Sequence, residues 1–217
     1  MENFTLILKE SFTTLLDNPL SILTVIGGVL LLLAIIKFKN IKLDSKIMAR
    51  IGIALALATI LNMIKIYALP NGGGSISLGS MIPILLIAFM YGPQIGLLTG
   101  FLFGIISLII NPYIMHPIQV LFDYPLPFMA VGFAGYFRKN MLLGTTLGMT
   151  LRFICHFISG YAFFGEFAPE GWSPALYSLV VNGVAVGGEL IICLIIIAIL
   201  PINRIIKETD NNISTVS

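Results

Sequence analysis

Four ionisable side chains stand inside apolar stretches of this 217-residue sequence: Asp123, Arg152, His156 and Glu189. Each can donate, accept or hold a charge where few other side chains can. If the stretches cross a bilayer, placing such a group inside costs roughly 2.5–3.5 kcal/mol on insertion scales, so it usually has a function or a partner. These four residues are therefore the first candidates for a functional site.

The composition indicates that lipid surrounds most of the chain. Apolar residues make up 58% of the sequence and charged residues only 10%, against about 25% charged in an ordinary soluble domain. Such a chain has too few polar residues to cover a soluble surface, which excludes a cytosolic enzyme, a nucleic-acid binder and a disordered protein. The formal net charge of +2 is also too small to indicate a polyanionic partner.

Apolar stretches near the roughly 20 residues that a spanning helix needs recur along the chain. We expect an all-α integral membrane protein with seven spans, separated by turn-forming strings such as Gly92-Pro93 and Asn111-Pro112. The expected spans are Leu20–Ile36, Ile51–Leu69, Leu78–Tyr91, Ile95–Ile110, Ile118–Phe137, Met141–Phe164 and Ser173–Leu200. Residues 1–18 are expected to form a short surface segment.

The basic residues predict the orientation of these spans. Nine of the 12 Lys and Arg residues follow the first, fifth or seventh span. They are Lys37, Lys39, Lys42, Lys46, Arg50, Arg138, Lys139, Arg204 and Lys207. Because basic loops stay in the cytoplasm, seven spans put the N-terminus outside and the C-terminus inside.

Polar groups from three spans fall at similar depths. At about 1.5 Å per residue, Asp123 lies about 9 Å below the outer end of its span, His156 about 12 Å and Arg152 about 18 Å. Arg152 and His156 are four residues apart, so they share one helix face. In the last span, Tyr177 lies about 6 Å deep and Asn182 about 14 Å. These groups can form a pocket that opens outward.

Such a pocket suits a flat organic cation. Asp123 offers the negative charge, and aromatic faces add cation–π contacts. The aromatic faces come from Tyr124, Tyr161, Phe164 and Tyr177. The remaining hydrogen-bonding groups come from Arg152, His156 and Asn182. The alternative is an internal Asp123–Arg152 ion pair that merely neutralises both residues.

Glu189 lies about 24 Å from the outer end of the last span, near the inner face. There it can snorkel, pair with a cytoplasmic base or carry a coupling proton. Small residues at helical spacing form three rows, at Gly96/Gly100/Gly104, Gly183/Gly187 and Ala54/Ala58. Such rows favour close helix packing within the chain, with docking of another membrane protein as the alternative.

Motifs of catalytic and metal sites are missing from the sequence. It contains no H-E-x-x-H, G-x-G-x-x-G or Walker A string. Cys155 and His156 are adjacent and point to different helix faces, which makes a poor metal pair. We therefore expect no catalytic residues, no metal, no cofactor and no ATP hydrolysis by this chain.

Four strings around the candidate residues resemble the ThiT (YuaJ) family, the thiamine-binding S components of energy-coupling factor (ECF) transporters. They are GGSISLGSMIPI at 73–84, HPIQVLFDYP at 116–125, LRFICHFISG with FFGEFAP at 151–169, and YSLVVN at 177–182. They occur in the family's order, and the third string is quite specific.

The resemblance implies a six-helix S-component bundle with an outward-facing thiamine site in a prokaryotic plasma membrane. The ligand-binding positions that it implies are Asp123, Tyr124, Arg152, His156, Phe164, Tyr177 and Asn182. Some members carry a tryptophan in the first outer loop, where this chain has the glycines near Gly74. Trp172, in another outer loop, can form part of a lid.

The resemblance also implies partners. Ala54 and Ala58 match the small-residue motif by which S components dock on a T component, with two ATPase subunits completing the module. ATP is then hydrolysed in the partners, and toppling of the S component delivers thiamine inward. The alternative function is a stand-alone, proton-coupled secondary transporter of a small organic cation.

One expected span, Leu20–Ile36, has no counterpart in the six-helix family fold. The expected division is therefore 1–48 as an N-terminal segment with this extra helix and a basic linker, 49–206 as the thiamine-binding membrane domain, and 207–217 as a polar tail.

Overall fold

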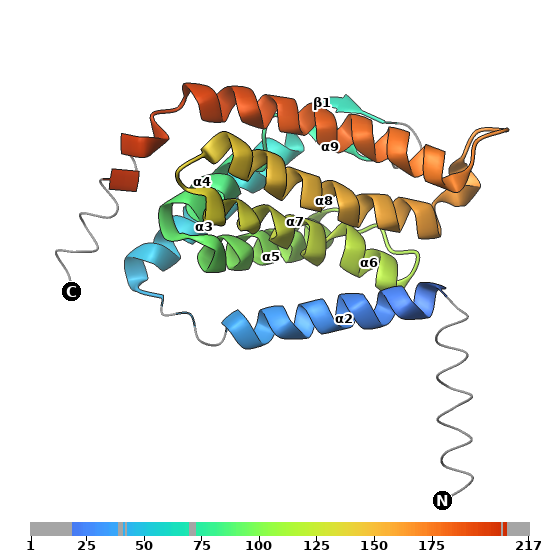
Figure 1. The fold of residues 1–217 in the computed structure, drawn as a ribbon, viewed down its shortest axis with the longest axis horizontal. Helices are drawn as coiled ribbons and strands as arrows, with labels where there is room; N and C mark the ends of the chain where they lie inside the picture. The colour runs from blue at the N-terminus through green and yellow to red at the C-terminus, as the bar shows by residue number, and fades with distance from the viewer. Residues whose placement is uncertain (1–18, 39–40, 42, 70–72, 205, 208–217) are drawn as a thin grey trace, which may run out of the picture.

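The computed structural model of the chain describes residues 19–38, 41, 43–69, 73–204 and 206–207. This part is a helical bundle with one small two-stranded sheet (Figure 1). Its α-helices are α2 (Pro19–Phe38), α3 (Ser45–Met63), α4 (Ile82–Tyr91), α5 (Pro93–Ile110), α6 (Pro117–Asp123), α7 (Pro125–Val131), α8 (Met141–Phe163) and α9 (Pro174–Ile199). The expected surface segment 1–18 and most of the expected tail lie outside the described residues.

Five segments of the described chain are long and apolar enough to cross a bilayer. They are Ser45–Met63, Pro93–Ile110, Pro117–Phe137, Met141–Phe163 and Pro174–Ile199. The apolar helix α4 has 10 residues, and α2 has 20. The helical membrane-protein class is therefore as predicted, whereas the count of six plus one spans and their orientation stay predictions.

The expected span Ile118–Phe137 matches the apolar segment Pro117–Phe137, but its helix is interrupted at Tyr124. Helix α6 ends at Asp123, α7 begins at Pro125, and the 3-10 helix η2 (Gly132–Phe137) follows. Proline has no amide hydrogen to continue the α-helical ladder, and it disfavours helical geometry at the residue before it. Tyr124 accordingly has φ −121° and ψ −80°. The break leaves Asp123 at a helix end inside the bundle.

The second expected span is also too long. Helix α3 ends at Met63, and Lys65–Ala68 forms strand β1, which pairs antiparallel with β2 (Ser75–Ser77). The chain then turns through Gly79, at φ +73°, before α4 begins. A positive φ favours glycine because it has no Cβ. This turn places Ser77 and Ser80 inside the bundle, where both are almost fully buried.

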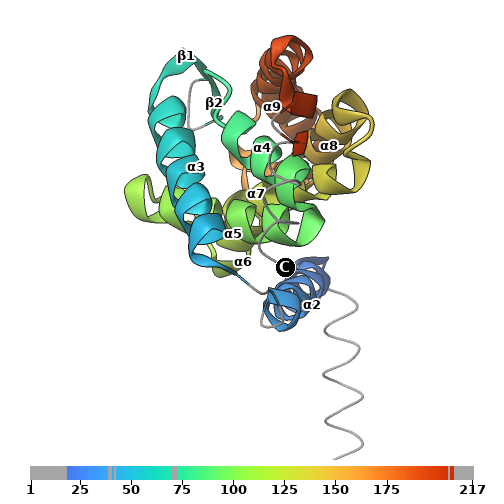
Figure 2. The same ribbon diagram turned by 90° about the vertical axis from the view of Figure 1, so that its left-hand side faces the viewer.

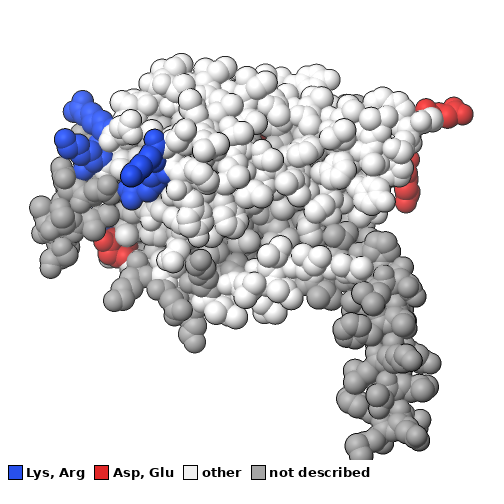
Figure 3. Space-filling model, in the orientation of Figure 1, with Lys and Arg blue, Asp and Glu red and all other residues white. Residues whose placement is uncertain are grey.

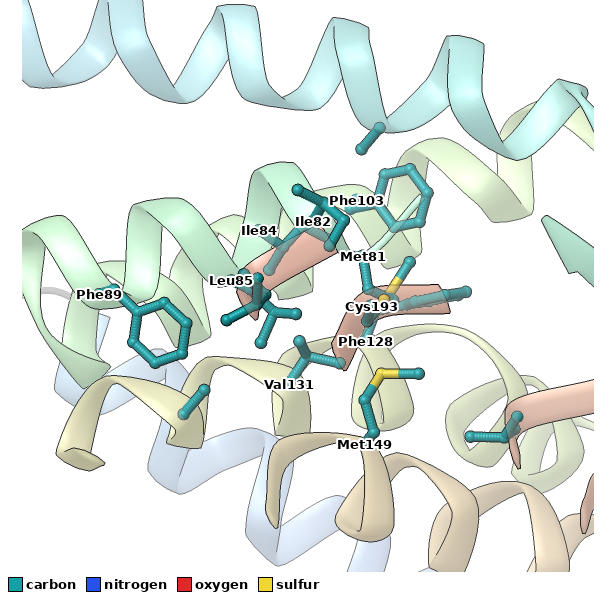
Figure 4. Packing of buried hydrophobic residues seen from close by; sticks show 14 of the residues in the cluster. Met81, Ile82, Ile84, Leu85, Phe89, Phe103, Phe128, Val131, Met149 and Cys193 are labelled. Carbon is teal, nitrogen blue, oxygen red and sulfur yellow. The ribbon is translucent and has the colours of Figure 1, made fainter. Parts of the chain in front are cut away.

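The main hydrophobic core lies between α4, α5, α7, α8 and α9 (Figure 4). Phe103 and Phe128 meet edge to face with ring centroids 4.9 Å apart. Val131 and Met149 are fully buried beside them. The Phe128 ring also contacts Arg152 and His156 of α8.

The glycine row of α5 packs within the chain, as expected. An ideal Cβ on Gly96 would lie 2.6 Å from the Ala88 Cβ, one on Gly100 would lie 2.1 Å from the Phe128 carbonyl oxygen, and one on Gly104 would lie 2.5 Å from the Tyr124 carbonyl oxygen. Only glycine allows α5 to approach α7 this closely. The α5–α7 contact therefore holds the chain at Tyr124 and in the helix that follows it.

Helix α2 lies along one side of the bundle, against α6 and α5 (Figures 1 and 2). At Gly27 an ideal Cβ would lie 3.1 Å from the Phe122 ring. The extra helix thus contacts the half-helix that ends at Asp123.

Charged side chains on the surface are sorted between the two ends of the bundle. Lys and Arg side chains visible in Figure 3 gather at the end where α8 begins and α9 ends, and most visible Asp and Glu side chains lie at the other end. That the basic end faces the cytoplasm stays a prediction from the Lys and Arg residues.

We predict that Gly100→Ala destabilises the protein, because the added methyl meets the backbone of Phe128. Overpacking of this kind costs about 1–3 kcal/mol. Thermal unfolding in detergent measures the effect. Gly183→Ala is the matched control, since nothing lies within 4 Å of its ideal Cβ. Equal unfolding temperatures for the two variants would contradict the packing role of this row.

Candidate ligand-binding site

Asp123 and His156 lie together where α6 meets α8. The Asp123 Oδ1 is 3.4 Å from the His156 Nδ1, and the two side chains are 19% and 16% exposed. Gln119 donates a 2.6 Å hydrogen bond from Nε2 to the Asp123 Oδ2. The carboxylate is therefore oriented from both sides while part of it stays exposed, as a counter-charge for a cationic ligand requires.

Arg152 forms its ion pair with Glu189 rather than with Asp123. The Arg152 Nη1 lies 2.6 Å from the Glu189 Oε2, and the two side chains are 10% and 1% exposed. The hydroxyls of Ser77 and Ser80 donate to the Glu189 Oε1 at 2.5 and 2.6 Å. The Asp123–Arg152 pair considered from the sequence is therefore wrong, and so is the expectation that Glu189 snorkels or pairs with a cytoplasmic base.

The Arg152–Glu189 pair follows from antiparallel packing of α8 and α9. The expected depths of the two residues, about 18 and about 24 Å, differ by about one helical turn, which their long side chains bridge. Depth alone does not predict the pair, because it does not show that α8 and α9 are neighbours. The buried position of Glu189 and its pairing with Arg152 are the largest differences from the predicted site.

The Phe128 ring lies between the two charged pairs. The Arg152 guanidinium carbon is 5.0 Å from the ring centroid, and the His156 ring meets it edge-on at 6.3 Å. A guanidinium over an aromatic face is stabilised by a cation–π interaction. The Arg152 Nε has no hydrogen-bond partner among the described residues. Phe128 was not predicted as a site residue, because its apolar surroundings resemble those of any core position.

Asn182 joins the cluster from α9. The Asn182 Nδ2 lies 3.2 Å from the His156 carbonyl oxygen and 3.1 Å from the Ser178 carbonyl oxygen. Gly160 makes this approach possible, since an ideal Cβ there would lie 2.8 Å from the Asn182 Nδ2. Tyr177 is buried at 8% exposure. Asn182 thus fixes α9 against the backbone of His156.

Tyr124 and Gln119 hold the loop between α5 and α6. The Tyr124 hydroxyl accepts a 2.8 Å hydrogen bond from the Tyr113 amide and donates to the Asn111 carbonyl at 2.9 Å. Gln119 is fully buried and accepts from the Met115 amide at 3.1 Å. Sequence reasoning missed Gln119 as a site residue, although it lies one helical turn before Asp123.

Aromatic rings line the same end of the molecule. Phe164 stacks on Tyr113 with centroids 5.8 Å apart, and His116 stacks on Phe163 at 5.2 Å. Tyr161 is 54% exposed, so it is not part of the cluster. Trp172 is 40% exposed, and its expected role in a lid stays a prediction.

These observations define a class: a multi-helix membrane protein with a polar, ion-paired cluster where α6, α8 and α9 meet. The family model described as Thiamine transporter protein (Thia_YuaJ) matches residues 48–208. The chain therefore belongs to this family of thiamine transporters.

Individual relatives agree with this assignment. The chain is 36% identical over 169 residues to the thiamine transporter ThiT of Bacillus subtilis (strain 168), covering 69% of this chain and 87% of the relative. It is 28% identical over 140 residues to ThiT of Lacticaseibacillus paracasei, covering 55% and 70%. A solved structure of ThiT from Listeria monocytogenes aligns with a TM-score of 0.65 at 29% identity, covering 71% of this chain and 92% of that one.

We predict that Gln119→Leu loosens the loop of residues 111–115 by removing its hydrogen bonds to Tyr113, Met115 and Asp123. Each lost hydrogen bond is worth about 0.5–1.5 kcal/mol, so amide hydrogen exchange in this loop should speed up about three- to tenfold. Hydrogen-exchange mass spectrometry of the peptide measures it, with a peptide of α5 as internal reference. Unchanged exchange would mean that Gln119 does not hold the loop.

Proposed function

We propose that this chain is the S component of an ECF-type importer, which captures thiamine from outside and delivers it inward with the help of partner subunits. Family membership supports thiamine as the ligand. The observation that carries the proposal is the Asp123–His156 pair, in which the mostly buried Asp123 carboxylate keeps 19% of its side chain exposed.

The roles of the site residues follow from their chemistry. The Asp123 carboxylate pairs with the positive thiazolium ring, and His156 and Asn182 offer hydrogen bonds to the aminopyrimidine ring. The stacked rings of Tyr113 and Phe164 open or shift to sandwich a flat ligand. Tyr124 and Tyr177 supply further aromatic contact, while Arg152 acts through its contact with Phe128.

Docking on a T component requires a face of α3 that the chain does not cover. Ala54 and Ala58 are 6% and 0% exposed and belong to the chain's own core, so the pair expected from the sequence is buried. Gly52 and Ala56 are exposed on the opposite face, and nothing lies within 4 Å of an ideal Cβ on Gly52. We therefore assign docking to Gly52 and Ala56, which keep the same four-residue spacing.

Transport energy in this proposal comes from the ATPase subunits of the module, in the plasma membrane, with the C-terminus cytoplasmic. The alternative, a stand-alone proton-coupled transporter, relied on Glu189 or Asp123 as the proton carrier. Glu189 is tied to Arg152 and two serine hydroxyls, an arrangement that stabilises its charged form and does not favour that alternative.

We predict that Asp123→Asn weakens thiamine binding at least tenfold, because a unit charge about 4 Å from a cation is worth several kcal/mol at a partly screened site. Isothermal titration calorimetry in detergent measures the affinity. Glu170→Gln is the matched control, since Glu170 is exposed in an outer loop. Equal affinity of the Asp123→Asn variant and the parent would remove Asp123 from the site.

We predict that Ala56→Leu blocks thiamine uptake into liposomes that also contain the ECF module and internal ATP, while thiamine affinity stays unchanged. The larger side chain prevents close approach of another helix to this face. Leu57→Ala, at an exposed position that does not belong to the small-residue pair, is the control. Uptake by the chain alone, abolished by a protonophore, would instead favour the secondary transporter.

A further inference from the structure

The charge of the polar cluster is set by three residues. Asp123, Arg152 and Glu189 are the ionised groups that meet inside the described bundle, with His156 beside them. Two carboxylates against one guanidinium leave one negative charge when His156 is neutral. Glu189 therefore decides whether the cluster as a whole is negative or neutral.

The surroundings of Glu189 keep it ionised. It is 1% exposed, yet its two oxygens accept hydrogen bonds from Ser77, Ser80 and Arg152. Hydrogen bonds of this kind stabilise a carboxylate relative to its protonated form. Ser77 ends strand β2 and Ser80 lies in the turn before α4, so this segment and α8 together hold the single negative charge of Glu189.

Arg152 is close enough to oppose a bound cation. It lies one helical turn from His156 on α8, and both contact the same Phe128 ring. His156 in turn lies 3.4 Å from Asp123, the residue proposed to face the ligand. In an interior of effective dielectric about 20, a unit charge about 10 Å away changes affinity about tenfold.

We propose that Glu189 is a specificity-determining residue: it cancels the charge of Arg152, so that the carboxylate of Asp123 acts on the ligand undiminished and the site selects a monocation. This inference rests on the proposed thiamine site and names the charge class that it takes. Arg152 keeps its place against Phe128, and Glu189 removes the electrostatic penalty that Arg152 alone would impose.

The test compares thiamine with deazathiamine, an isostere in which an uncharged thiophene replaces the thiazolium ring. The ratio of the two affinities measures how strongly the site favours positive charge. Glu189→Gln keeps the acceptor for Ser77 and Ser80 but removes the charge, and it should lower the ratio about tenfold. The double variant Glu189→Gln/Arg152→Gln removes both charges and should return the ratio to that of the parent. Arg152→Gln alone should raise it.

Competitive calorimetry on each variant, checked for folding by gel filtration and thermal unfolding, gives the four ratios. If Glu189 only supports the fold, its loss weakens both ligands equally, and a flat ratio across the series would overturn the proposal. If Glu189→Gln fails to fold, the other variants still test the proposal. The affinity ratio of Arg152→Gln should then exceed that of the parent, and the ratio of the double variant should equal it. Failure of the parent to bind thiamine would instead refute the proposed function, and this inference with it.

Discussion

The buried ion pair between Arg152 and Glu189 is the constraint on which the rest of the structure depends. It joins α8 to α9 and, through Ser77 and Ser80, both helices to the turn before α4. Removing one partner of such a pair commonly costs about 3–5 kcal/mol, because the other charge is left buried without compensation. The pair also takes Arg152 away from Asp123, whose carboxylate is contacted by His156 and Gln119 among the residues that the structure describes.

A second constraint acts on the backbone. Pro125 ends α6 at Asp123, so the Asp123 carboxylate lies where the helix is interrupted within an apolar segment long enough to span the membrane. Non-helical backbone at membrane depth is tolerated where protein buries it. Here Gly104 lets α5 pack against the Tyr124 carbonyl, and the Tyr124 hydroxyl satisfies the backbone of the neighbouring loop. The interruption of the helix therefore places Asp123 at a helix end within the bundle.

Hydropathy and spacing predicted much of this arrangement. The helical membrane class, the packing role of Gly96, Gly100 and Gly104, and the meeting of three helices around His156 all follow from local pattern. The helix break at Tyr124 was missed because mean hydropathy does not register that a proline interrupts the helix within an apolar run. The partner of Arg152 was missed because it depends on which helices are neighbours. The burial of Ala54 and Ala58 was missed because spacing does not tell which face of a helix is covered.

Thiamine binding is the property from which the other proposed roles follow. The most direct measurement is calorimetric titration of the purified, ligand-stripped protein with thiamine, with riboflavin as the comparison ligand. We predict tight one-to-one binding of thiamine and no heat with riboflavin. No heat with thiamine, from protein shown to be folded by its thermal unfolding, would contradict it.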